Sequence, residues 1–351
     1  MSTETIRAGI LGATGYTGGI LAAILQQHPQ VEVKSYGSRS YVGKRYDKEF
    51  RNLFGLPGAE RPCEEENPAA LAEEVDVLFL ATPQGMAAGL VTDALLNKVK
   101  VIDLSADFRF DDLSVYEKWY GLKAADVKIN AEAVYGLPEL YRDKIRTARL
   151  VANPGCYTTC SILTAYPLVK ERLIDPHTII VDALSGVSGA GRGAKVDNLF
   201  CEVNESAKPY GIATHRHTPE IEEHLSGAAG EPVVISFTPH LVPMNRGILA
   251  TVYATLKGQD SDAVRAAYEK YYGDEPFVRL LENDMNADTK WVEGSNFIDI
   301  AYTIDPRTNR IVMNAALDNL MKGAASQAVQ NMNLMFGFEE SSGLNFIPVF
   351  P

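Results

Sequence analysis

The sequence is poor in the features that mark secreted, membrane-bound and nucleic-acid-binding proteins. Its 351 residues include four cysteines, Cys63, Cys156, Cys160 and Cys201, which are too few and too unevenly spaced for a disulfide framework. It contains no long run of Lys or Arg, and its formal net charge of -12 would repel phosphate backbones and anionic lipids. We therefore expect a cytoplasmic protein whose partners include neither nucleic acid nor membrane.

A continuous apolar stretch is also missing from the N-terminal segment. Residues Met1 to Arg7 are polar, and five glycines between Gly9 and Gly19 interrupt the apolar residues that follow. This pattern is typical of neither a signal peptide nor a membrane-spanning helix. The length favours about two domains, which bury enough surface to fold without disulfides or a structural metal.

The N-terminal part alternates strand and helix patterns. Short apolar runs bounded by turn residues predict strands, and longer runs of helix-forming residues predict helices. This alternation predicts an α/β fold with a doubly wound parallel sheet, and hence a Rossmann-type domain over residues 1–154. The predicted strands are Arg7–Leu11, Val31–Tyr36, Val75–Ala81 and Val99–Leu104, and the predicted helices are Ile20–Gln27 and Gly85–Asn97.

The pattern changes after Asn153-Pro154-Gly155. Strand candidates separated by long insertions predict a mixed or antiparallel sheet in a second, α+β domain over residues 155–317. A last helix is expected within the C-terminal segment 318–351. The predicted elements are helices at Cys156–Arg172 and Asp318–Met335 and strands at Thr178–Leu184, Val233–Thr238, Gly247–Leu256, Asn296–Ile304 and Arg310–Ala316.

Three evenly spaced glycines lie between the first predicted strand and the first predicted helix. A glycine turn at this place lets backbone N–H groups approach a pyrophosphate, and the helix start adds positive potential. A plain strand-to-helix turn is the alternative, but the flanking strand, helix and second strand occur in the order that a dinucleotide site requires. We therefore predict cofactor binding by the turn residues Gly12, Ala13, Thr14, Gly15, Tyr16, Thr17 and Gly18.

The residues after the second predicted strand favour NADP over NAD. An acidic residue there would accept a hydrogen bond from the ribose 2′-hydroxyl, whereas a basic residue would pair with a 2′-phosphate. Ser38 and Arg39 follow this strand, while Glu32, at the usual spacing for the acid, lies inside it. We therefore predict NADP(H) as the cofactor, with Arg39 supplying a charged fork and Ser38 a hydroxyl donor.

Cys156 lies at the start of a predicted helix, where the helix dipole and free N–H groups lower the pKa of a thiol. A thiolate there would be a nucleophile, and the alternative is a small buried residue without chemistry. The other three cysteines are expected to be core residues, and no metal site is expected because the cysteine pair lacks further ligands. The acidic run Glu64-Glu65-Glu66 is expected to lie on solvated surface.

Two histidines, His215 and His217, flank Arg216 just before a helix expected to be capped by Thr218, with Pro219 at its first position. A thiolate mechanism needs a general acid/base with a pKa near neutrality, and histidine is the usual choice. Zinc ligation and a plain surface pair are the alternatives. The lack of a cysteine or acid cluster at metal spacing argues against zinc.

Six segments of the chain occur in the order found in one known family. They are Gly12–Gly18 (GATGYTG), Leu104–Arg109 (LSADFR), Tyr135–Leu140 (YGLPEL), Asn153–Tyr157 (NPGCY), Ser188–Arg192 (SGAGR) and His215–Glu220 (HRHTPE). Together they resemble the N-acetyl-gamma-glutamyl-phosphate reductase family of arginine biosynthesis, from about residue 6 to the C-terminus. One departure is Thr158, where members of the family often have proline.

The resemblance implies a fold, an assembly and roles for several residues. It implies a second domain of the glyceraldehyde-3-phosphate dehydrogenase type for catalysis and oligomerisation, a C-terminal helix that returns to the NADP-binding domain, and a homotetramer. Cys156 is then the nucleophile, and the base is one of the two histidines, with His217 favoured over His215 because it lies nearest the predicted helix. Ser188 and Gly189 would lie near the nicotinamide, with Asn319 as its carboxamide partner.

The activity that the resemblance implies is NADPH-dependent reduction of N-acetyl-gamma-glutamyl phosphate to N-acetyl-glutamate 5-semialdehyde and phosphate, through a cysteine thioester. Aspartate-semialdehyde dehydrogenase and the aminoadipyl-phosphate reductase of lysine biosynthesis are related alternatives, and a non-catalytic NADP-sensing regulator is an alternative of another class. A substrate with a carboxylate and a phosphoryl group requires cationic or polar donors. The candidates are Ser105, Arg109, Arg192, Lys195 and Arg216.

Overall fold

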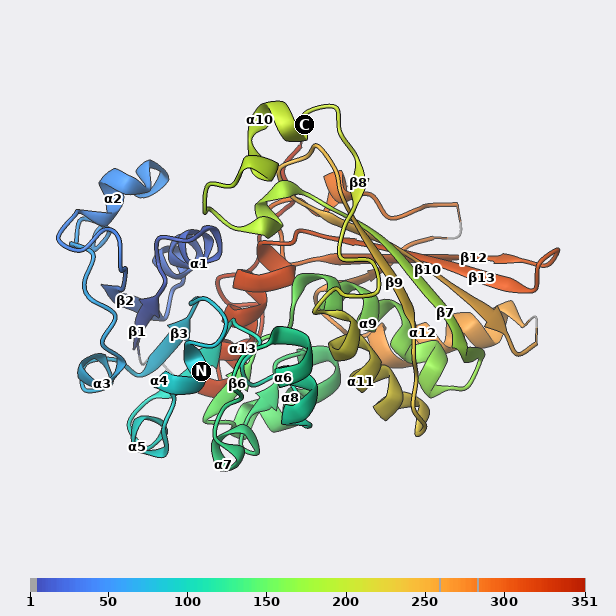
Figure 1. Ribbon diagram of the computed structural model, residues 1–351, viewed down its shortest axis with the longest axis horizontal. Helices are drawn as coiled ribbons and strands as arrows, with labels where there is room; N and C mark the ends of the chain where they lie inside the picture. The colour runs from blue at the N-terminus through green and yellow to red at the C-terminus, as the bar shows by residue number, and fades with distance from the viewer. Residues whose placement is uncertain (1–4, 259, 283, 351) are drawn as a thin grey trace. The chain divides into compact units, whose positions relative to one another are not determined.

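The structure is a computed structural model that describes residues 5–258, 260–282 and 284–350 (Figure 1). The chain divides into two compact units. Unit 1 comprises Met1–Pro154 and Ala324–Asn345, and unit 2 comprises Gly155–Gly323 and Phe346–Pro351. The C-terminal part of the chain is therefore shared between the units.

Unit 1 is built on a six-stranded sheet in which all neighbouring strands run parallel. The strand order is β2-β1-β3-β4-β6-β5, so the direction in which the chain builds the sheet reverses at β1. Doubly wound sheets bind their ligands at such a reversal. The predicted doubly wound parallel sheet is confirmed, with strands β1 Ile6–Leu11, β2 Val31–Tyr36, β3 Val77–Leu80, β4 Lys100–Asp103, β5 Val134–Tyr135 and β6 Leu150–Ala152.

The strands at the centre of this sheet are buried along their whole length. All residues of β3 and β6 are inaccessible to solvent, as is typical of parallel strands covered on both faces. The helices of unit 1 are α1 Tyr16–Gln27, α2 Tyr46–Glu49, α3 Pro68–Leu71, α4 Ala87–Leu90, α5 Asp93–Leu96, α6 Leu113–Tyr120, α7 Val127–Asn130, α8 Pro138–Thr147 and α13 Ser326–Phe336, with a 3-10 turn at Arg51–Leu53.

Helix α13 belongs to unit 1 although it comes from the C-terminal part of the chain. It packs against α1, α8 and β4, and its residues from Ser326 to Met335 are buried. Several of these are amides, and Asn331 Nδ2 donates to Gly136 O at 2.8 Å and to Asn153 Oδ1 at 3.0 Å. Such bonds offset the cost of burying the amide. Unit 1 thus includes a buried helix that lies far away in sequence from the strands of its sheet.

Unit 2 is built on a seven-stranded mixed sheet with the order β11-β12-β13-β10-β7-β9-β8. The pairs β12–β13, β13–β10 and β10–β7 are antiparallel, whereas β7–β9 and β11–β12 are parallel. The predicted mixed sheet is confirmed. Its strands are β7 Ile174–Ser185, β8 Lys208–Pro209, β9 Ser236–Leu241, β10 Ile248–Leu256, β11 Val278–Leu280, β12 Ile298–Asp305 and β13 Arg310–Leu317.

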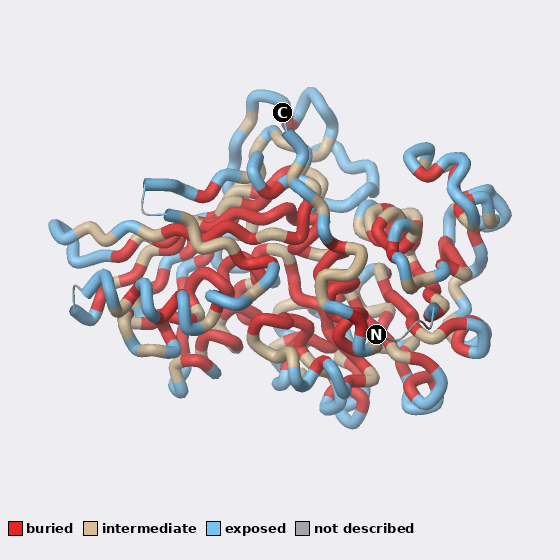
Figure 2. Tube along the Cα trace, turned by 180° about the vertical axis from the view of Figure 1, so that it is seen from behind, coloured by how far each residue is buried: buried red, intermediate tan, exposed pale blue. Residues whose placement is uncertain are grey.

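One face of this sheet is covered by helices. Helix α9 packs on β7, β10 and β13, and α11 and α12 pack on α9 (Figure 1). Accordingly β10 alternates buried and half-buried residues along its length, and the buried strands stand out against exposed loops (Figure 2). The helices are α9 Cys156–Lys170, α10 Phe200–Val203, α11 Thr218–Ala229 and α12 Ser261–Tyr272, with 3-10 turns at Val187–Ala190, Val196–Asn198 and Thr289–Trp291 and a π-helical turn at Met321–Ala325.

Two predicted elements differ from those in the structure because side-chain oxygens accept hydrogen bonds from backbone N–H groups. The single helix expected at Gly85–Asn97 is instead the two short helices α4 and α5, and Thr92 Oγ1 accepts the Leu95 N–H at 3.2 Å, which starts α5 anew. The carboxylate of Asp107, which accepts the Tyr116 hydroxyl at 2.8 Å, also accepts the N–H groups of Gly85, just before α4, and Ala88, within it.

The strand predicted at Val233–Thr238 begins later, at Ser236 in β9. The N–H groups of Val233 and Ile235 donate to Ser226 Oγ and Glu222 Oε1 of α11 instead of to a neighbouring strand.

Among the described residues, no helix combines the length and the apolar character needed to cross a bilayer.

Candidate cofactor and active sites

The glycine turn of unit 1 is shaped by two positions that exclude a side chain. Gly12 follows β1 with a φ of +77°, and a Cβ there would overlap the carbonyl group of Ala81. A Cβ at Gly18, in the first turn of α1, would overlap the Gly12 carbonyl oxygen. These glycines allow the turn, the helix and the chain after β3 to approach closely, as in a tight dinucleotide-binding turn.

Gly15 occupies the open position of the turn. A Cβ there would meet only Gly12 O, at 3.5 Å, so a ligand can approach the backbone at this point. Gly15 is also the N-cap of α1, and no side chain caps this helix. The first helical turn has N–H groups without intrahelical acceptors, and its dipole favours an anion. The turn therefore fits a dinucleotide pyrophosphate.

The remaining residues of the turn connect it to the rest of unit 1. The buried Ala13 donates its N–H to Gly37 O at 2.9 Å and accepts the Tyr46 hydroxyl at 2.8 Å. Tyr16 is 42% exposed, and Thr17 follows it in the first turn of α1. Hydrogen bonds of the Ala13 backbone thus hold the turn, and the side chains at the start of α1 remain at least partly exposed.

Ser38 and Arg39 follow β2 but have different environments. Ser38 is buried, and its Oγ lies 2.9 Å from Thr14 Oγ1 and accepts the N–H groups of Ser40 and Tyr41 at 3.3 Å. Its hydroxyl therefore fastens the glycine turn to the next loop. The Arg39 side chain is 59% exposed. Of the two residues, Arg39 is the cation that can meet a 2′-phosphate.

Two acidic residues, Glu32 and Glu66, lie in this region and have different environments. Glu32, in β2, pairs with Lys34 at 2.7 Å and has a half-exposed side chain. The Glu66 side chain is only 8% exposed, and its Oε1 accepts the Gly12 N–H at 3.0 Å. The expectation that this acidic run is solvated is wrong for Glu66. Sequence spacing could not reveal it, because the two residues are 54 positions apart.

In unit 2, Cys156 is the first residue of α9. Gly155 is the N-cap and supplies no side-chain hydrogen bond. Cys156 is partly exposed, whereas Cys63 and Cys160 are buried. Burial raises the pKa of the Cys63 thiol to about 11, and it also raises the pKa of Cys160. Cys201 is exposed, so the expectation that it is a core residue is wrong.

A buried carboxylate from α11 fixes the start of α9. Glu220 is inaccessible to solvent, and its Oε1 accepts the Gly155 N–H at 3.1 Å. The hydroxyl of Thr158 lies 2.9 Å from the same oxygen. Thr158, at the position where the resembling family often has proline, therefore adds a polar contact to Glu220. The residues on both sides of the nucleophile candidate are held by one acid.

The two histidines lie just before α11 and have different hydrogen bonding. His215 Nδ1 accepts the backbone N–H of His217 at 3.1 Å, which places the proton of a neutral His215 on Nε2. Burial, with the adjacent charge of Arg216 as a second cause, lowers the pKa of His215 to about 4. The helix begins at Thr218 with His217 at the N-cap position, one residue earlier than the predicted cap.

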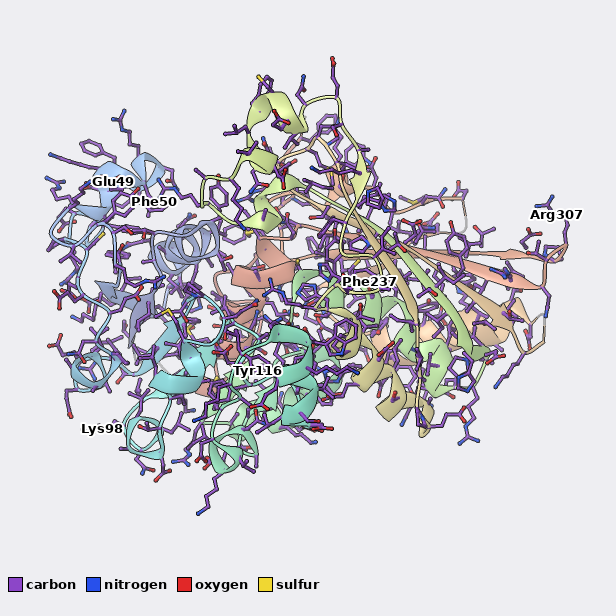
Figure 3. The ribbon with its side chains drawn as sticks, viewed as in Figure 1. Glu49, Phe50, Lys98, Tyr116, Phe237 and Arg307 are labelled. Carbon is purple, nitrogen blue, oxygen red and sulfur yellow. The ribbon has the colours of Figure 1, made fainter. Side chains whose placement is uncertain are left out.

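Aromatic rings surround the two histidines. The ring of Tyr157 lies 5.6 Å from that of His215, 6.0 Å from that of His217 and 5.4 Å from that of Phe237, which β9 contributes (Figure 3). The hydroxyl groups of Tyr157 and Tyr210 hydrogen bond to each other at 3.0 Å. No sequence motif indicated Tyr210 or Phe237, because both come from segments distant from Cys156.

The charge of Cys156 acts on this aromatic cluster. Burial is the main cause that raises the pKa of Tyr157 and raises that of Tyr210 to about 12, and negative charge at Cys156 raises both further. Both phenols therefore stay protonated at neutral pH. Cys156 and the cluster that contains the histidines thus form one electrostatic site within unit 2.

Ser188, Gly189 and Asn319 also come together in unit 2. Asn319 Nδ2 donates to Ser188 Oγ at 3.0 Å, and a Cβ on Gly189 would lie 3.8 Å from the same nitrogen. Asn319 Oδ1 accepts the Gly247 N–H at 2.9 Å. The three residues for which the resemblance implies nicotinamide contacts are therefore neighbours, and Asn319 is anchored to the sheet.

The π-helical turn Met321–Ala325 holds its backbone against the nucleophile candidate. A Cβ on Gly323 would lie 2.8 Å from Cys156 Cβ, a distance that real side chains do not show. The turn is fixed by the buried Asp318, whose carboxylate pairs with Arg246 at 3.0 Å and accepts the Leu320 N–H at 2.8 Å. π-helical turns are frequent at functional sites.

Two predicted substrate residues lie in a buried polar loop after β4 of unit 1. Ser105 donates its N–H and its hydroxyl to Asp103 at 2.9 and 2.7 Å, and Arg109 Nη2 donates to Leu104 O at 3.0 Å. Burial, followed by the charge of Asp107, raises the pKa of Asp103 to about 7. Ser105 and Arg109 are themselves at most 7% exposed.

The other predicted cations lie on exposed parts of unit 2. Arg216 is exposed between the two histidines, so it is the one that belongs to the Cys156 region by position. Arg192 and Lys195 are exposed in the segment between the 3-10 turns Val187–Ala190 and Val196–Asn198.

Both units match known protein families. Residues 7–148 match the semialdehyde dehydrogenase NAD binding domain, and residues 156–319 match the semialdehyde dehydrogenase dimerisation domain. Similar solved structures include aspartate semialdehyde dehydrogenase II from Vibrio cholerae (TM-score 0.70, 18% identity, 95% of this chain and 99% of that chain). Another is aspartate semialdehyde dehydrogenase with NADP from Candida albicans (TM-score 0.71, 16% identity, 95% and 99%). These structures share the fold.

Curated relatives are similar over nearly the whole chain. The N-acetyl-gamma-glutamyl-phosphate reductase of Lachnoclostridium phytofermentans is 58% identical over 347 residues, which are 99% of this chain and 100% of that protein. The proteins of the same name from Campylobacter jejuni subsp. jejuni serotype O:6 and Moorella thermoacetica are 54% and 51% identical, each over 97% of this chain and 98% of the relative.

Proposed function

The chain belongs to the N-acetyl-gamma-glutamyl-phosphate reductase family, and we propose that it reduces its acyl phosphate through a thioester on Cys156. It is an oxidoreductase that uses NADPH to convert N-acetyl-gamma-glutamyl phosphate to N-acetyl-glutamate 5-semialdehyde and phosphate, in arginine biosynthesis. The observation that carries the proposal is the position of Cys156, partly exposed at the uncapped start of α9. A thiolate is stabilised there.

The first step is attack of the Cys156 thiolate on the acyl carbon. The new C–S bond forms as the C–O bond to phosphate breaks, and phosphate leaves with the electron pair. Bound NADPH supplies a hydride to the thioester carbonyl carbon. His217 takes the thiol proton before attack and returns it to the oxygen that hydride addition leaves negative. His217 then removes the hydroxyl proton of the thiohemiacetal as the C–S bond breaks with its electron pair going to sulfur, which releases the aldehyde and restores the Cys156 thiolate.

His217 is the base that the hydrogen bonding favours. His215 uses Nδ1 to accept a backbone N–H and has a pKa of about 4, so it is too weak a base to take up a proton at neutral pH. His215 instead orients the loop that carries His217. The phenols of Tyr157 and Tyr210 stay protonated; Tyr157 packs against both histidine rings and Tyr210 against that of His215.

The cofactor site is proposed on unit 1, over residues 1–154, with the pyrophosphate at the turn Gly12–Gly18 and the 2′-phosphate at Arg39. Ser38 supports this site through Thr14 and the loop N–H groups instead of donating to the phosphate. Ser188, Gly189 and Asn319 are proposed to serve the nicotinamide end. Ser105, Arg109, Arg192 and Arg216 are proposed for the charged groups of the substrate.

Residues 155–317 are proposed to carry catalysis and oligomerisation, and we propose a cytoplasmic homotetramer. The match of residues 156–319 to a dimerisation domain supports a homo-oligomer. A nucleophilic thiol also requires a reducing compartment. Light scattering coupled to size-exclusion chromatography measures the assembly, and a mass of one or two chains would contradict the tetramer.

The test follows NADP reduction with N-acetylglutamate semialdehyde and phosphate, and compares the wild type with Cys156→Ser. Activity that vanishes in the variant is the expected result. Iodoacetamide should modify Cys156 fastest, and the acyl phosphate should protect it. Turnover with aspartate semialdehyde alone would assign another substrate, and undiminished turnover in the variant would exclude Cys156 as the nucleophile.

A further inference from the structure

An acidic residue that the reaction does not use occupies the proposed adenosine end of the cofactor site. The chain leaves β2 at Gly37 and returns beside it, where Gly37 bridges to Glu64 and Ser38 N–H donates to Glu64 O at 2.9 Å. Two residues later, Glu66 turns inward. Its Oε1 accepts the Gly12 N–H at 3.0 Å, and its Oε2 lies 3.5 Å from Arg39 Nε.

We infer that Glu66 is a specificity-determining residue that limits the preference of the enzyme for NADPH over NADH. The inference rests on the proposed NADPH site at Arg39. In dinucleotide-binding turns an acid near the end of the second strand accepts the ribose 2′-hydroxyl of NADH, whereas a cation pairs with the 2′-phosphate of NADPH. Here both kinds of group are present, 3.5 Å apart.

Glu66 lies in space where such an acid is expected, although it does not follow the glycine turn at the usual spacing of about twenty residues. Its two partners are Gly12, the first glycine of the turn, and Arg39, which follows β2 and is the proposed contact of the 2′-phosphate. Glu32, which has the usual spacing, is instead paired with Lys34 at the surface. The loop between Gly37 and Glu66 therefore supplies the acid that β2 does not.

The two charges act in opposite directions on a 2′-phosphate. Arg39 attracts it, and Glu66 repels it, since the phosphate carries more than one negative charge at neutral pH. The Arg39–Glu66 pair is weak because the Arg39 side chain is 59% exposed, so a phosphate can replace the carboxylate as its partner. The Glu66 side chain is 8% exposed, so its repulsion is screened less than that of a surface charge.

The experiment measures dissociation constants of NADPH and NADH by titration calorimetry, without turnover. Glu66→Gln keeps an oxygen that can accept the Gly12 N–H and removes the charge. We expect NADPH to bind about fivefold more tightly, from the removed repulsion alone, and NADH to change by less than about twofold. Glu65→Gln, an equal charge change at the exposed neighbouring residue, should leave both constants at the wild-type values.

Arg39→Ala separates failure of this inference from failure of the cofactor assignment. If Arg39→Ala weakens NADPH binding more than NADH binding while Glu66→Gln leaves their ratio unchanged, Glu66 has no role in specificity. If Arg39→Ala weakens both cofactors equally, the assignment of the 2′-phosphate to Arg39 is itself wrong. Glu66→Ala provides the same ratio should the glutamine variant not fold, and tightening by Glu65→Gln would also overturn the inference.

Discussion

His215 Nδ1 accepts the backbone N–H of His217 at 3.1 Å, so the two neighbouring histidines are not equivalent. The first accepts a backbone hydrogen bond within the loop, and its pKa of about 4 leaves it neutral at neutral pH. The second occupies the N-cap position of α11, within the aromatic cluster of Tyr157. We therefore propose a structural role for His215 and the proton-transfer role for His217.

Replacement of each histidine by asparagine tests this difference. His217→Asn should lower kcat by about 10²- to 10⁴-fold, the usual contribution of a general acid/base. His215→Asn keeps an acceptor for the N–H of residue 217 and should cost much less. Because His215 titrates near pH 4, its variant should keep the wild-type pH profile of kcat/KM between roughly pH 6 and 8. A larger loss in His215→Asn than in His217→Asn would reverse the assignment.

Gly323→Ala should misplace the nucleophile. The new Cβ would lie 2.8 Å from Cys156 Cβ, so the π-helical turn or the start of α9 must move. We expect kcat and the rate of iodoacetamide modification to fall by about 10- to 100-fold, with KM nearly unchanged. Gly227→Ala in α11, where a Cβ would meet nothing within 4 Å, is the matched control and should keep full activity. Equal modification rates in both variants would contradict the positioning role.

Thr158→Val should destabilise the fold through Glu220. It keeps the shape of the side chain but removes a hydroxyl that lies 2.9 Å from the buried carboxylate and 2.6 Å from Gly155 O, which should lower the free energy of unfolding by about 1.5–3 kcal/mol. Thr159→Val removes a hydroxyl bond to the neutral Gly155 carbonyl at 3.0 Å and should cost about 1 kcal/mol. Urea denaturation measures both values. Equal losses would mean that the charge of Glu220 contributes nothing.

The stability of unit 1 should decrease in mild acid because of His28. Burial lowers the pKa of this histidine, whose Nε2 lies 3.0 Å from Asn333 Oδ1 and whose Nδ1 accepts the Gln30 N–H at 3.2 Å. The unfolded chain binds a proton near pH 6.5 while the folded chain does not, so the free energy of unfolding falls as pH decreases below that value. His28→Gln should flatten this decrease, whereas His177→Gln, at an exposed position, should not.

Much of the fold could be predicted because, in most elements, the local pattern of apolar and turn residues agrees with the place of the element in the folded structure. The strand Val31–Tyr36 was bounded correctly by alternation and a following glycine, and the helix start at Cys156 by Asn153-Pro154-Gly155. The predicted helix boundaries were wrong where a side-chain oxygen, near or distant in sequence, accepts a hydrogen bond from a backbone N–H group. Within the helix expected at Gly85–Asn97, Asp107 binds N–H groups at the start of α4 and Thr92 starts α5 anew, and neither effect is visible in hydrophobic periodicity.

The candidate site residues also divide into those that short motifs predicted and those that depend on contacts between distant segments. Cys156 and the histidines follow from short motifs, because their chemistry depends on residues adjacent in sequence. Glu66 and Gly323 depend on contacts that span long sequence separations, with Gly12 and with Cys156 respectively. No spacing rule covers such contacts, so the sequence suggested solvated surface for Glu66 and did not reveal the contact of Gly323 with Cys156.

The division of the chain between the units has a consequence for its synthesis. The buried helix α13 completes unit 1, where Asn331 binds Gly136 and Asn153, yet it is translated only after nearly all of unit 2. The first 154 residues therefore emerge from the ribosome with polar groups and apolar surface that α13 will later cover. Unit 1 cannot finish folding cotranslationally, and a stalled or truncated chain exposes this surface to chaperones and proteases.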